Sequence, residues 1–422
     1  MADGAALIAE EARARAYSTP LKDIDVTDVG LFTSDTFWPY FERLRAEDPV
    51  HYCESSQYGP YWSVCLYNDI VQVEGDHQTF SSSSELGGIT VFDGNEPNDR
   101  TNFIALDPPM HDAQRKVVAP MFSTTSIANL EPLIRERAGK ILDELPIGET
   151  FDFVDKVSIE LTSQMLATLF DFPFEDRRVL PRFSDMVLAG PDPTATPEEV
   201  MTWQQEAFAI LGRFTPLWNE RASRPLRDDL ISMLAHGEST RKDNDPTRYF
   251  GNIILLIVAG SDTTRHSITG GLIALNENPD QYAKLRTNPG LIPTMVPEII
   301  RWQSPVAHMR RTALADAVIG GKAIKKGDKV VVWYVSGNRD ETAIENAGQF
   351  IIDRERPRQH VSFGFGIHRC LGQRLAEMQL GVVWQEMLKR FPSIEIMGEP
   401  TRLRSNFVKG YETLPVRIPS RA

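Results

Sequence analysis

Cys370 is the residue whose surroundings best fit a chemical role. It lies between a glycine-rich turn and an amphipathic segment that predicts a helix, within FGFGIHRCLGQRLAEMQL at residues 363–380. A helix N-terminus stabilises a thiolate, which favours metal ligation. Gly366 allows a turn with positive φ that aims N–H groups toward the sulfur, Gly372 lets the helix approach a flat ligand, and Phe363 can shield the sulfur from water. The pattern indicates a protected, ionised sulfur, although an arbitrary cysteine at a helix start is more often structural.

A polar cluster interrupts the longest apolar segment of the chain. Residues 259–265 read AGSDTTR, so Gly260, Asp262 and Thr263 fall inside a predicted core helix. All three are unfavourable in a helix interior, which indicates a compensating role. The alternative is an incidental polar patch.

Two charged pairs have helical spacing. Glu298 and Arg301 are at positions i and i+3, while His111 and Arg115 are at i and i+4, so each pair shares a helical face. Such pairs are usually exposed and contribute only roughly 0.2–0.5 kcal/mol. By spacing alone, neither pair indicates more than a solvated helix surface.

The elements that must position these residues are mostly helical. Apolar spacing predicts a helix over 35–49, several helices from about 110 to 291, and one long helix over 248–279. Strand character appears at 51–55, 61–67 and 329–340, and a hairpin is predicted over 407–419. The loop over 81–103 is long and polar enough to indicate a functional surface loop. The fold class is therefore mainly α with small β-sheets, in which residues 1–30 form a loosely held leader and 31–422 a single domain.

Composition excludes several classes of function. The chain has 45 Lys+Arg against 58 Asp+Glu and a net charge of -13, which disfavours nucleic acid as a partner. No apolar run approaches the roughly 18 residues of a membrane span, and the first residues lack the basic lead of a signal peptide. We therefore expect a cytoplasmic protein. The chain's 3 cysteines include no CxxC pair, which disfavours a disulfide framework and a cysteine-rich zinc site.

The segment Phe363-x-x-Gly366-x-x-x-Cys370-x-Gly372 resembles the haem-binding loop of the cytochrome P450 superfamily. The resemblance extends over roughly residues 37–422. It implies the P450 fold, with a long central helix over haem b, and Cys370 as the axial thiolate ligand of the iron. In that family the sulfur pushes electron density toward the iron and favours O–O cleavage.

The same resemblance assigns roles to the polar cluster of the long helix. Gly260 would leave room for dioxygen, while Asp262 and Thr263 would relay protons to it. Family members usually have Gly-Gly before the acid and alcohol. This chain has Ala259–Gly260, a departure that affects how substrate fits over the haem.

The charged pairs also acquire roles from the resemblance. Glu298 and Arg301 would form a buried network with an arginine ahead of the Cys370 loop, for which Arg356 is the first candidate and Arg354 the alternative. Haem propionates need cationic, hydrogen-bonding partners. The implied partners are His111, Arg115, His368 and Arg311, with Arg310 as the alternative to Arg311.

Within the superfamily, ELGGIT, DPPMHDAQRK, SDTTR, EIIRWQSPVAHMRR and RPRQHVSFGFGIHRCLG are most similar to soluble bacterial alkane and fatty-acid terminal (omega) hydroxylases. The implied reaction uses dioxygen and two electrons to hydroxylate a medium-chain n-alkane or fatty acid at its end. A terminal methyl C–H bond is stronger than internal ones, so a narrow apolar channel must present the methyl first. The channel candidates, each of which could be ordinary core, are Ile89, Val91, Leu255, Val258, Ala259, Val306 and Phe407.

The resemblance implies an external electron supply, because no flavin or iron–sulfur segment follows the haem loop. Electrons would pass from NAD(P)H through a ferredoxin reductase and a [2Fe-2S] ferredoxin. A basic patch suited to an acidic ferredoxin would comprise Arg115, Lys116, Arg369 and Arg374. The alternatives are a hydroxylase of a terpene or steroid-like substrate, a peroxide-driven hydroxylase, which would not need the acid and alcohol, and a non-enzymatic haem-thiolate sensor or carrier.

Overall fold

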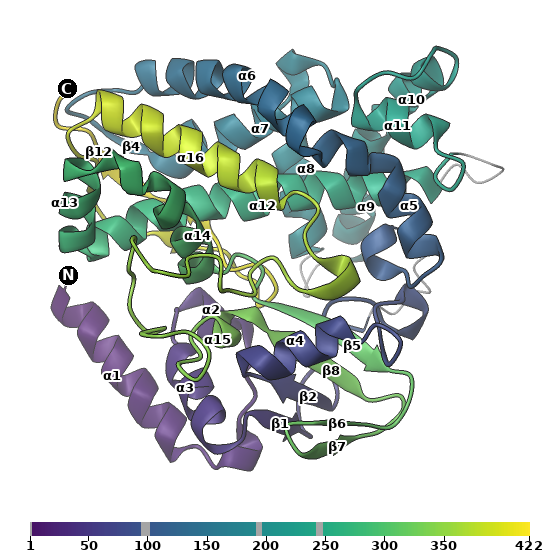
Figure 1. Cartoon of the computed structure of the whole chain (residues 1–422), viewed down its shortest axis with the longest axis vertical. Coiled ribbons are helices and arrows are strands. Elements are labelled where there is room, and N and C mark those ends of the chain that lie inside the picture. The colour runs from purple at the N-terminus through teal and green to yellow at the C-terminus, as the bar shows by residue number, and fades with distance from the viewer. Residues whose placement is uncertain (1, 94–101, 191–195, 242–247) are drawn as a thin grey trace. The chain divides into compact units, whose positions relative to one another are not determined.

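The computed structural model describes residues 2–93, 102–190, 196–241 and 248–422 (Figure 1). Its contacts divide the chain into two compact units, each built from three segments. We call Met1–Asn98, Pro297–Cys370 and Arg402–Lys409 the sheet unit, and Asp99–Val296, Leu371–Thr401 and Gly410–Ala422 the helical unit. The predicted mainly α fold with small β-sheets is confirmed.

A five-stranded sheet organises the sheet unit. Its strand order is β1 (Val50–Cys53), β2 (Tyr61–Val64), β8 (Lys329–Trp333), β5 (His308–Ala313) and β3 (Phe80–Ser81). Only the β2–β8 pair is parallel. The central strand β8 has the sequence KVVVW and is buried along its whole length, as β-branched residues between two neighbouring strands should be.

Helices and a small hairpin complete the sheet unit. They are α1 (Ala2–Ser18), α2 (Val29–Thr33), α3 (Trp38–Glu47), α4 (Tyr67–Gly75), α15 (Tyr334–Gly337), and the hairpin strands β6 (Ala317–Ile319) and β7 (Lys322–Ile324). The expected leader contains α1, which is held to α3: Ala16 is fully buried, and Arg13 pairs with Glu42 at 2.7 Å. The leader is therefore packed on the sheet unit rather than loosely held, while the single domain over 31–422 stays a prediction.

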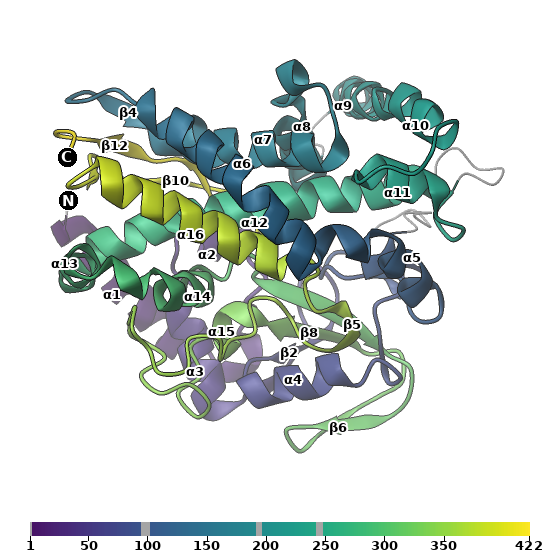
Figure 2. The same cartoon turned by 45° about the horizontal axis from the view of Figure 1, so that its top comes forward.

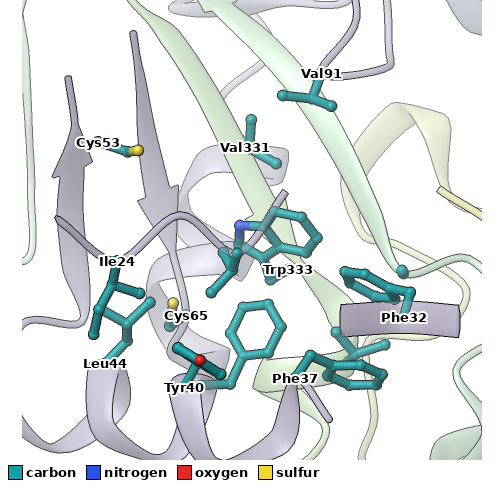
Figure 3. Packing of buried hydrophobic residues seen from close by; sticks show 14 of the residues in the cluster. Ile24, Phe32, Phe37, Tyr40, Leu44, Cys53, Cys65, Val91, Val331 and Trp333 are labelled. Carbon is teal, nitrogen blue, oxygen red and sulfur yellow. The ribbon is translucent and has the colours of Figure 1, made fainter. Parts of the chain in front are cut away.

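An aromatic core lies beside the sheet (Figure 3). Phe32 stacks on Phe37 with ring centroids 4.5 Å apart, and Phe41 lies 5.1 Å from Trp333 of β8. Val91, from the long loop, is a buried member of the same cluster.

The helical unit is built around α12 (Arg248–Glu277), the predicted long helix. The other helices are α5 (Met110–Val118), α6 (Thr124–Asp143), α7 (Glu160–Phe170), α8 (Val179–Ala189), α9 (Pro197–Gly212), α10 (Phe214–Ala222), α11 (Leu230–His236), α13 (Pro279–Thr287) and α16 (Gln373–Arg390), with α14 (Ile292–Gln303) crossing into the sheet unit. Helices α6 and α16 lie side by side in both views (Figures 1 and 2), and α7, α8 and α16 pack on α12. The apolar surface of α12 explains this central position.

Several strand predictions need correction. The strand expected over 61–67 ends at Val64, and α4 begins at Tyr67. The strand expected over 329–340 ends at Trp333, because its ladder with β5 ends there, and α15 follows. The expected hairpin over 407–419 is wrong: β12 (Pro415–Arg417) pairs with β4 (Thr150–Asp152) and β9 (Glu395–Ile396) instead of with β11 (Tyr411–Thr413). A single residue between β11 and β12 is too short for a hairpin turn.

Candidate functional site

Cys370 differs from the other two cysteines in its exposure. Its thiol-bearing side chain is exposed, whereas Cys53 and Cys65 are buried. Burial raises the pKa of Cys53 to about 11 and that of Cys65 to about 12. Neither of the buried thiols therefore forms a thiolate near neutral pH, and Cys370 is the cysteine that an external ligand can reach.

The turn before Cys370 requires glycine. Gly366 has φ +67°, as predicted, and a Cβ there would lie 2.1 Å from the carbonyl oxygen of Glu74. Gly364 also has positive φ, at +66°. Only glycine meets both the backbone angle and the close approach at position 366.

Three N–H groups of this turn donate hydrogen bonds to oxygen atoms. The N–H of Cys370 donates to the carbonyl of Phe363 at 2.8 Å, and that of Arg369 donates to Gly366 at 3.2 Å. The N–H of Phe365 donates to Glu74 at 2.7 Å. These three N–H groups have oxygen acceptors, and the expectation that several N–H groups of the turn point at the sulfur stays a prediction.

Glu74 is a site residue that the sequence interpretation missed. Its carboxylate accepts hydrogen bonds from Tyr334 Oη at 2.6 Å, Arg311 Nη2 at 2.8 Å and the Phe365 N–H. Burial raises its pKa, although the charge of Arg311 and these hydrogen bonds oppose the rise. A signal was present: Glu74 follows Val73 on the buried face of α4, where helical spacing calls for an apolar residue.

The predicted network around Glu298 is present, with a different arginine. Glu298 and Arg301 are fully buried and form two bonds of 2.7 Å, and Arg354 Nε donates to Glu298 at 3.0 Å. Arg356 is exposed. The first candidate, Arg356, is therefore wrong, because the Ile351 N–H, which donates to Glu298 at 2.8 Å, holds this segment so that Arg354 faces inward.

The charge balance of this network favours an ionised carboxylate. Burial alone would raise the pKa of Glu298, but the hydrogen bonds of Arg301 and Arg354 and the charge of Arg301 lower it overall. The helix α14, which carries Glu298 and Arg301, is also joined to the chain that precedes the Cys370 turn, because Ser362 Oγ donates a hydrogen bond to the Ile300 carbonyl at 2.9 Å. The network thus fixes the chain just before the glycine-rich turn.

Asp262 of α12 is buried against α8. It accepts a hydrogen bond from Ser184 Oγ at 2.5 Å and lies 2.7 Å from Arg265 Nη2, which also contacts Asp185. Burial raises the pKa of Asp262 to about 6, against the charge of Arg265 and the Ser184 hydrogen bond. Sequence interpretation found Asp262 but missed Ser184 and Asp185, which lie on another helix.

An accessible stripe runs along α12, which is otherwise mostly buried. Leu255 and Thr263 are half-buried and Ala259 is exposed, at spacing i, i+4 and i+8, and Val258 beside them is half-buried. The Thr263 hydroxyl donates to the Ala259 carbonyl at 2.9 Å. Three predicted channel residues and the predicted alcohol thus share one helical face that a ligand can reach.

Gly260 has a packing reason of its own. A Cβ at this position would lie 2.8 Å from Leu166 Cδ2 on α7. Its role in leaving room for dioxygen stays a prediction.

The remaining channel candidates lie in the sheet unit and divide into two groups. Val306 and Phe407 are half-buried and adjacent, because the Ala307 N–H donates to the Phe407 carbonyl at 2.8 Å. Ile89 is also half-buried. Val91 is only 2% exposed and packs in the aromatic core, so it is ordinary core rather than channel lining. Residues 94–101 of the same loop lie outside the described residues.

The predicted propionate partners fall in both units. His111 is buried on α5, where its Nδ1 lies 2.8 Å from Asp112, and burial lowers its pKa. Arg311 is committed to Glu74 beside the Cys370 turn, whereas Arg310 contacts Asp93 and the Leu86 carbonyl in the long loop. Arg115 is half-buried on α5, and His368 is half-buried two residues before Cys370.

The basic residues predicted to meet a ferredoxin are mostly exposed: Lys116 on α5, Arg369 beside Cys370, and Arg374 on α16. Whether they form one patch stays a prediction. Among the residues that the structure describes, no helix is long and apolar enough to cross a membrane.

The chain is similar to known proteins over nearly its whole length. Residues 290–410 match the family described as cytochrome P450. The chain is 37% identical over 405 residues to linalool 8-monooxygenase of Pseudomonas putida, covering 93% of this chain and 98% of that one. It is 30% identical over 431 residues to a methyl-branched lipid omega-hydroxylase of Mycobacterium tuberculosis, covering 95% of this chain and 97% of that one.

Its fold is similar to that of a solved relative. The structure of CYP153D17 from a Sphingomonas species matches with a TM-score of 0.87 and 44% identity, covering 93% of this chain and 98% of that one. Sequence and fold therefore agree over the same extent of chain, and the protein that carries the Cys370 turn and the Asp262 cluster belongs to the cytochrome P450 family and is a P450 monooxygenase.

Proposed function

We propose that this monooxygenase hydroxylates medium-chain n-alkanes or fatty acids at the terminal carbon, with electrons from a [2Fe-2S] ferredoxin. The observation that carries the proposal is the stripe of Leu255, Ala259 and Thr263, where apolar residues and a hydroxyl share one accessible face of a helix that is otherwise mostly buried. Such a face suits an apolar chain that must be oxidised beside a proton donor.

Family membership implies haem b, and the residues present fit it. Cys370 offers an exposed sulfur on a turn held by glycine geometry, and α12 offers an accessible apolar face. When bound, haem activates dioxygen so that one oxygen atom enters a C–H bond. Cys370 would hold the iron, with Phe363 and Gly372 beside it, and the propionates would be bound by His111, Arg115, His368 and either Arg311 or, because Arg311 is paired with Glu74, its neighbour Arg310.

Asp262 and Thr263 would supply protons during the reaction. A carboxyl whose pKa is about 6 can hold and release a proton near neutral pH. Arg265 joins Asp262 to Asp185, whose side chain is 50% exposed, so the buried acid is connected toward water. Thr263 would then orient the last proton donor on the accessible face of α12.

Substrate would be bound by apolar burial. The residues proposed to contact the substrate are Leu255, Val258 and Ala259 of α12, together with Ile89, Val306 and Phe407. Each buried methylene contributes only about 0.8 kcal/mol, so chain length is discriminated weakly and geometry sets the position of attack. Similarity to a methyl-branched lipid omega-hydroxylase supports terminal attack.

A second candidate substrate is a terpene or steroid-like compound. The similarity to a linalool 8-monooxygenase favours it, because linalool is a terpene alcohol. A peroxide-driven enzyme is disfavoured, since it would not need the Asp262 and Thr263 pair. Electron delivery from NAD(P)H through a reductase and ferredoxin is supported by the exposure of Arg369 and Arg374.

One experiment tests the proposal in three steps. The purified protein is reduced under carbon monoxide to find the Soret band of a thiolate-ligated haem. Alkanes, fatty acids, terpenes and steroids are then titrated spectrally, and the products formed with NADH, reductase and ferredoxin are identified. Terminal alcohols from linear chains are expected. Only in-chain or ring products would overturn terminal hydroxylation, and a missing thiolate band would overturn the haem-thiolate assignment.

A further inference from the structure

Glu74 joins three separate elements at the Cys370 turn. Its Oε1 accepts from Arg311 Nη2 of β5 at 2.8 Å and from Tyr334 Oη of α15 at 2.6 Å. Its Oε2 accepts from the Phe365 N–H at 2.7 Å. One carboxylate therefore ties a buried cation to the turn that ends in Cys370.

A carboxylate at this position needs a reason beyond packing. Glu74 is 4% exposed, and its neighbours on the buried face of α4, Ile70 and Val73, are fully buried apolar residues. A buried charge is costly unless it is paired and hydrogen-bonded, and an apolar residue of similar volume often replaces it without loss. The three hydrogen-bond donors offset the unfavourable burial of the Glu74 carboxylate, and their positions indicate what its charge does.

The backbone of Glu74 also shapes the turn. A Cβ at Gly366 would lie 2.1 Å from the Glu74 carbonyl oxygen, and one at Gly364 would lie 3.2 Å from Glu74 Oε2 and 3.1 Å from Tyr334 Oη. Both glycines have positive φ. Both the main chain and the side chain of Glu74 therefore lie against the turn and restrict its conformation.

We propose that Glu74 is a positioning residue that fixes the Cys370 turn through the Phe365 amide and balances the charge of Arg311, so that it tunes the electronic properties of the thiolate centre. The inference rests on the proposed haem-thiolate function. Hydrogen bonding and nearby charge around a ligating sulfur are among the means by which a protein sets the potential of its iron.

The test compares variants of the whole haem-loaded protein. Glu74→Gln removes the charge at nearly constant volume, Glu74→Asp keeps the charge on a shorter side chain, and Glu54→Gln is the control at an exposed carboxylate of the same unit. The midpoint potential, the Soret band of the reduced carbon monoxide complex and hydrogen exchange at the Phe365 amide are measured for each.

For Glu74→Gln we expect a more positive potential, because one negative charge is lost while Arg311 remains. We also expect a smaller fraction of thiolate-ligated complex, and about tenfold faster exchange at Phe365, because a charged acceptor is lost. Glu74→Asp should restore the potential toward that of the wild type. A merely structural role would change unfolding without moving the potential.

Two failures are distinguishable. If the wild type shows the thiolate band and Glu74→Gln matches Glu54→Gln in potential, band and exchange, the positioning role of Glu74 is overturned while the proposed function stands. If the wild type lacks the thiolate band, the proposed function itself fails. Should Glu74→Gln bind no haem, exchange at the Phe365 amide in Glu74→Asp decides the matter: exchange faster than in Glu54→Gln supports the positioning role, and equal exchange overturns it.

Discussion

The Oδ2 atom of Asp262 accepts a hydrogen bond from the Ser184 hydroxyl at 2.5 Å, which joins the middle of α12 to α8. The next residue of α8, Asp185, contacts the same Arg265 guanidinium that lies 2.7 Å from Asp262. The buried acid is therefore held by groups from a second helix. Because Asp185 is half exposed, this arrangement gives the acid both a fixed orientation and a polar connection to solvent.

Asp262→Asn should uncouple electron use from product formation. The amide keeps the volume of the side chain but cannot donate a carboxyl proton, and positioned acids typically contribute on the order of 100-fold or more. We expect product formed per NADH consumed to fall strongly while haem binding is retained. Asp280→Asn, at an exposed position on α13, is the matched control. Equal coupling in the two variants would contradict the relay.

The burial of Asp262 also predicts how stability depends on pH. Its folded-state pKa is about 6, above the usual 3.8, so between these values the folded protein binds more protons than the unfolded chain. The contribution of Asp262 to stability should therefore fall as pH rises from about 4 to about 6, by roughly 3 kcal/mol, and then level off. Urea unfolding of the wild type and of Asp262→Asn across this pH range measures that contribution as the difference between their free energies of unfolding. A constant difference between the two proteins would show that Asp262 has an ordinary pKa.

Local patterns in the sequence predicted the elements better than their partners. The core position of α12 follows from apolar spacing, and the positive φ of Gly366 follows from the turn that the motif needs. Neither pattern identifies the residue that pairs with a buried charged side chain. Ser184 is 78 positions from Asp262, and the Phe365 amide is 291 positions from Glu74, so only the folded chain reveals these pairs.

The choice between Arg354 and Arg356 illustrates the same limit. Both precede the Cys370 turn at similar spacing, and which one faces Glu298 depends on how the Ile351 N–H anchors the segment. Likewise, Val91 and Ile89 are equally apolar neighbours, yet Val91 is buried in the aromatic core and Ile89 is half-buried. Side-chain direction over two residues is set by tertiary contacts rather than by residue type.

Replacing Arg354 should destabilise the protein far more than replacing Arg356. Arg354→Ala removes one of two cations that balance the buried Glu298 carboxylate, with an expected loss of about 2–4 kcal/mol. Arg356→Ala removes an exposed side chain and should change stability by no more than about 0.5 kcal/mol. Urea unfolding of the two variants measures the difference. Similar losses in both would mean that Arg354 does not carry the network.

Enlarging Ala259 should alter substrate choice. Ala259→Leu adds bulk to the accessible face of α12, so we expect weaker binding of long chains and a shift of preference toward shorter ones. Val91→Ala is the control, because Val91 lies in the core: it should cost about 2 kcal/mol of stability and leave product regiochemistry unchanged. Spectral titration with a chain-length series and analysis of products measure both. Unchanged chain-length preference in Ala259→Leu would place substrate elsewhere.

Charge reversal beside Cys370 should slow reduction by a ferredoxin. Arg369 is exposed one residue before the predicted iron ligand, so Arg369→Glu would replace an attraction with a repulsion for an acidic partner. We expect the second-order rate of reduction to fall about tenfold at low ionic strength, and the difference to shrink as salt screens the charges. Lys326→Glu, at an exposed position in the sheet unit, should have little effect. Stopped-flow reduction over a range of salt concentrations measures the rates. A rate that is insensitive to both salt and Arg369→Glu would mean that the electron donor approaches without this charge.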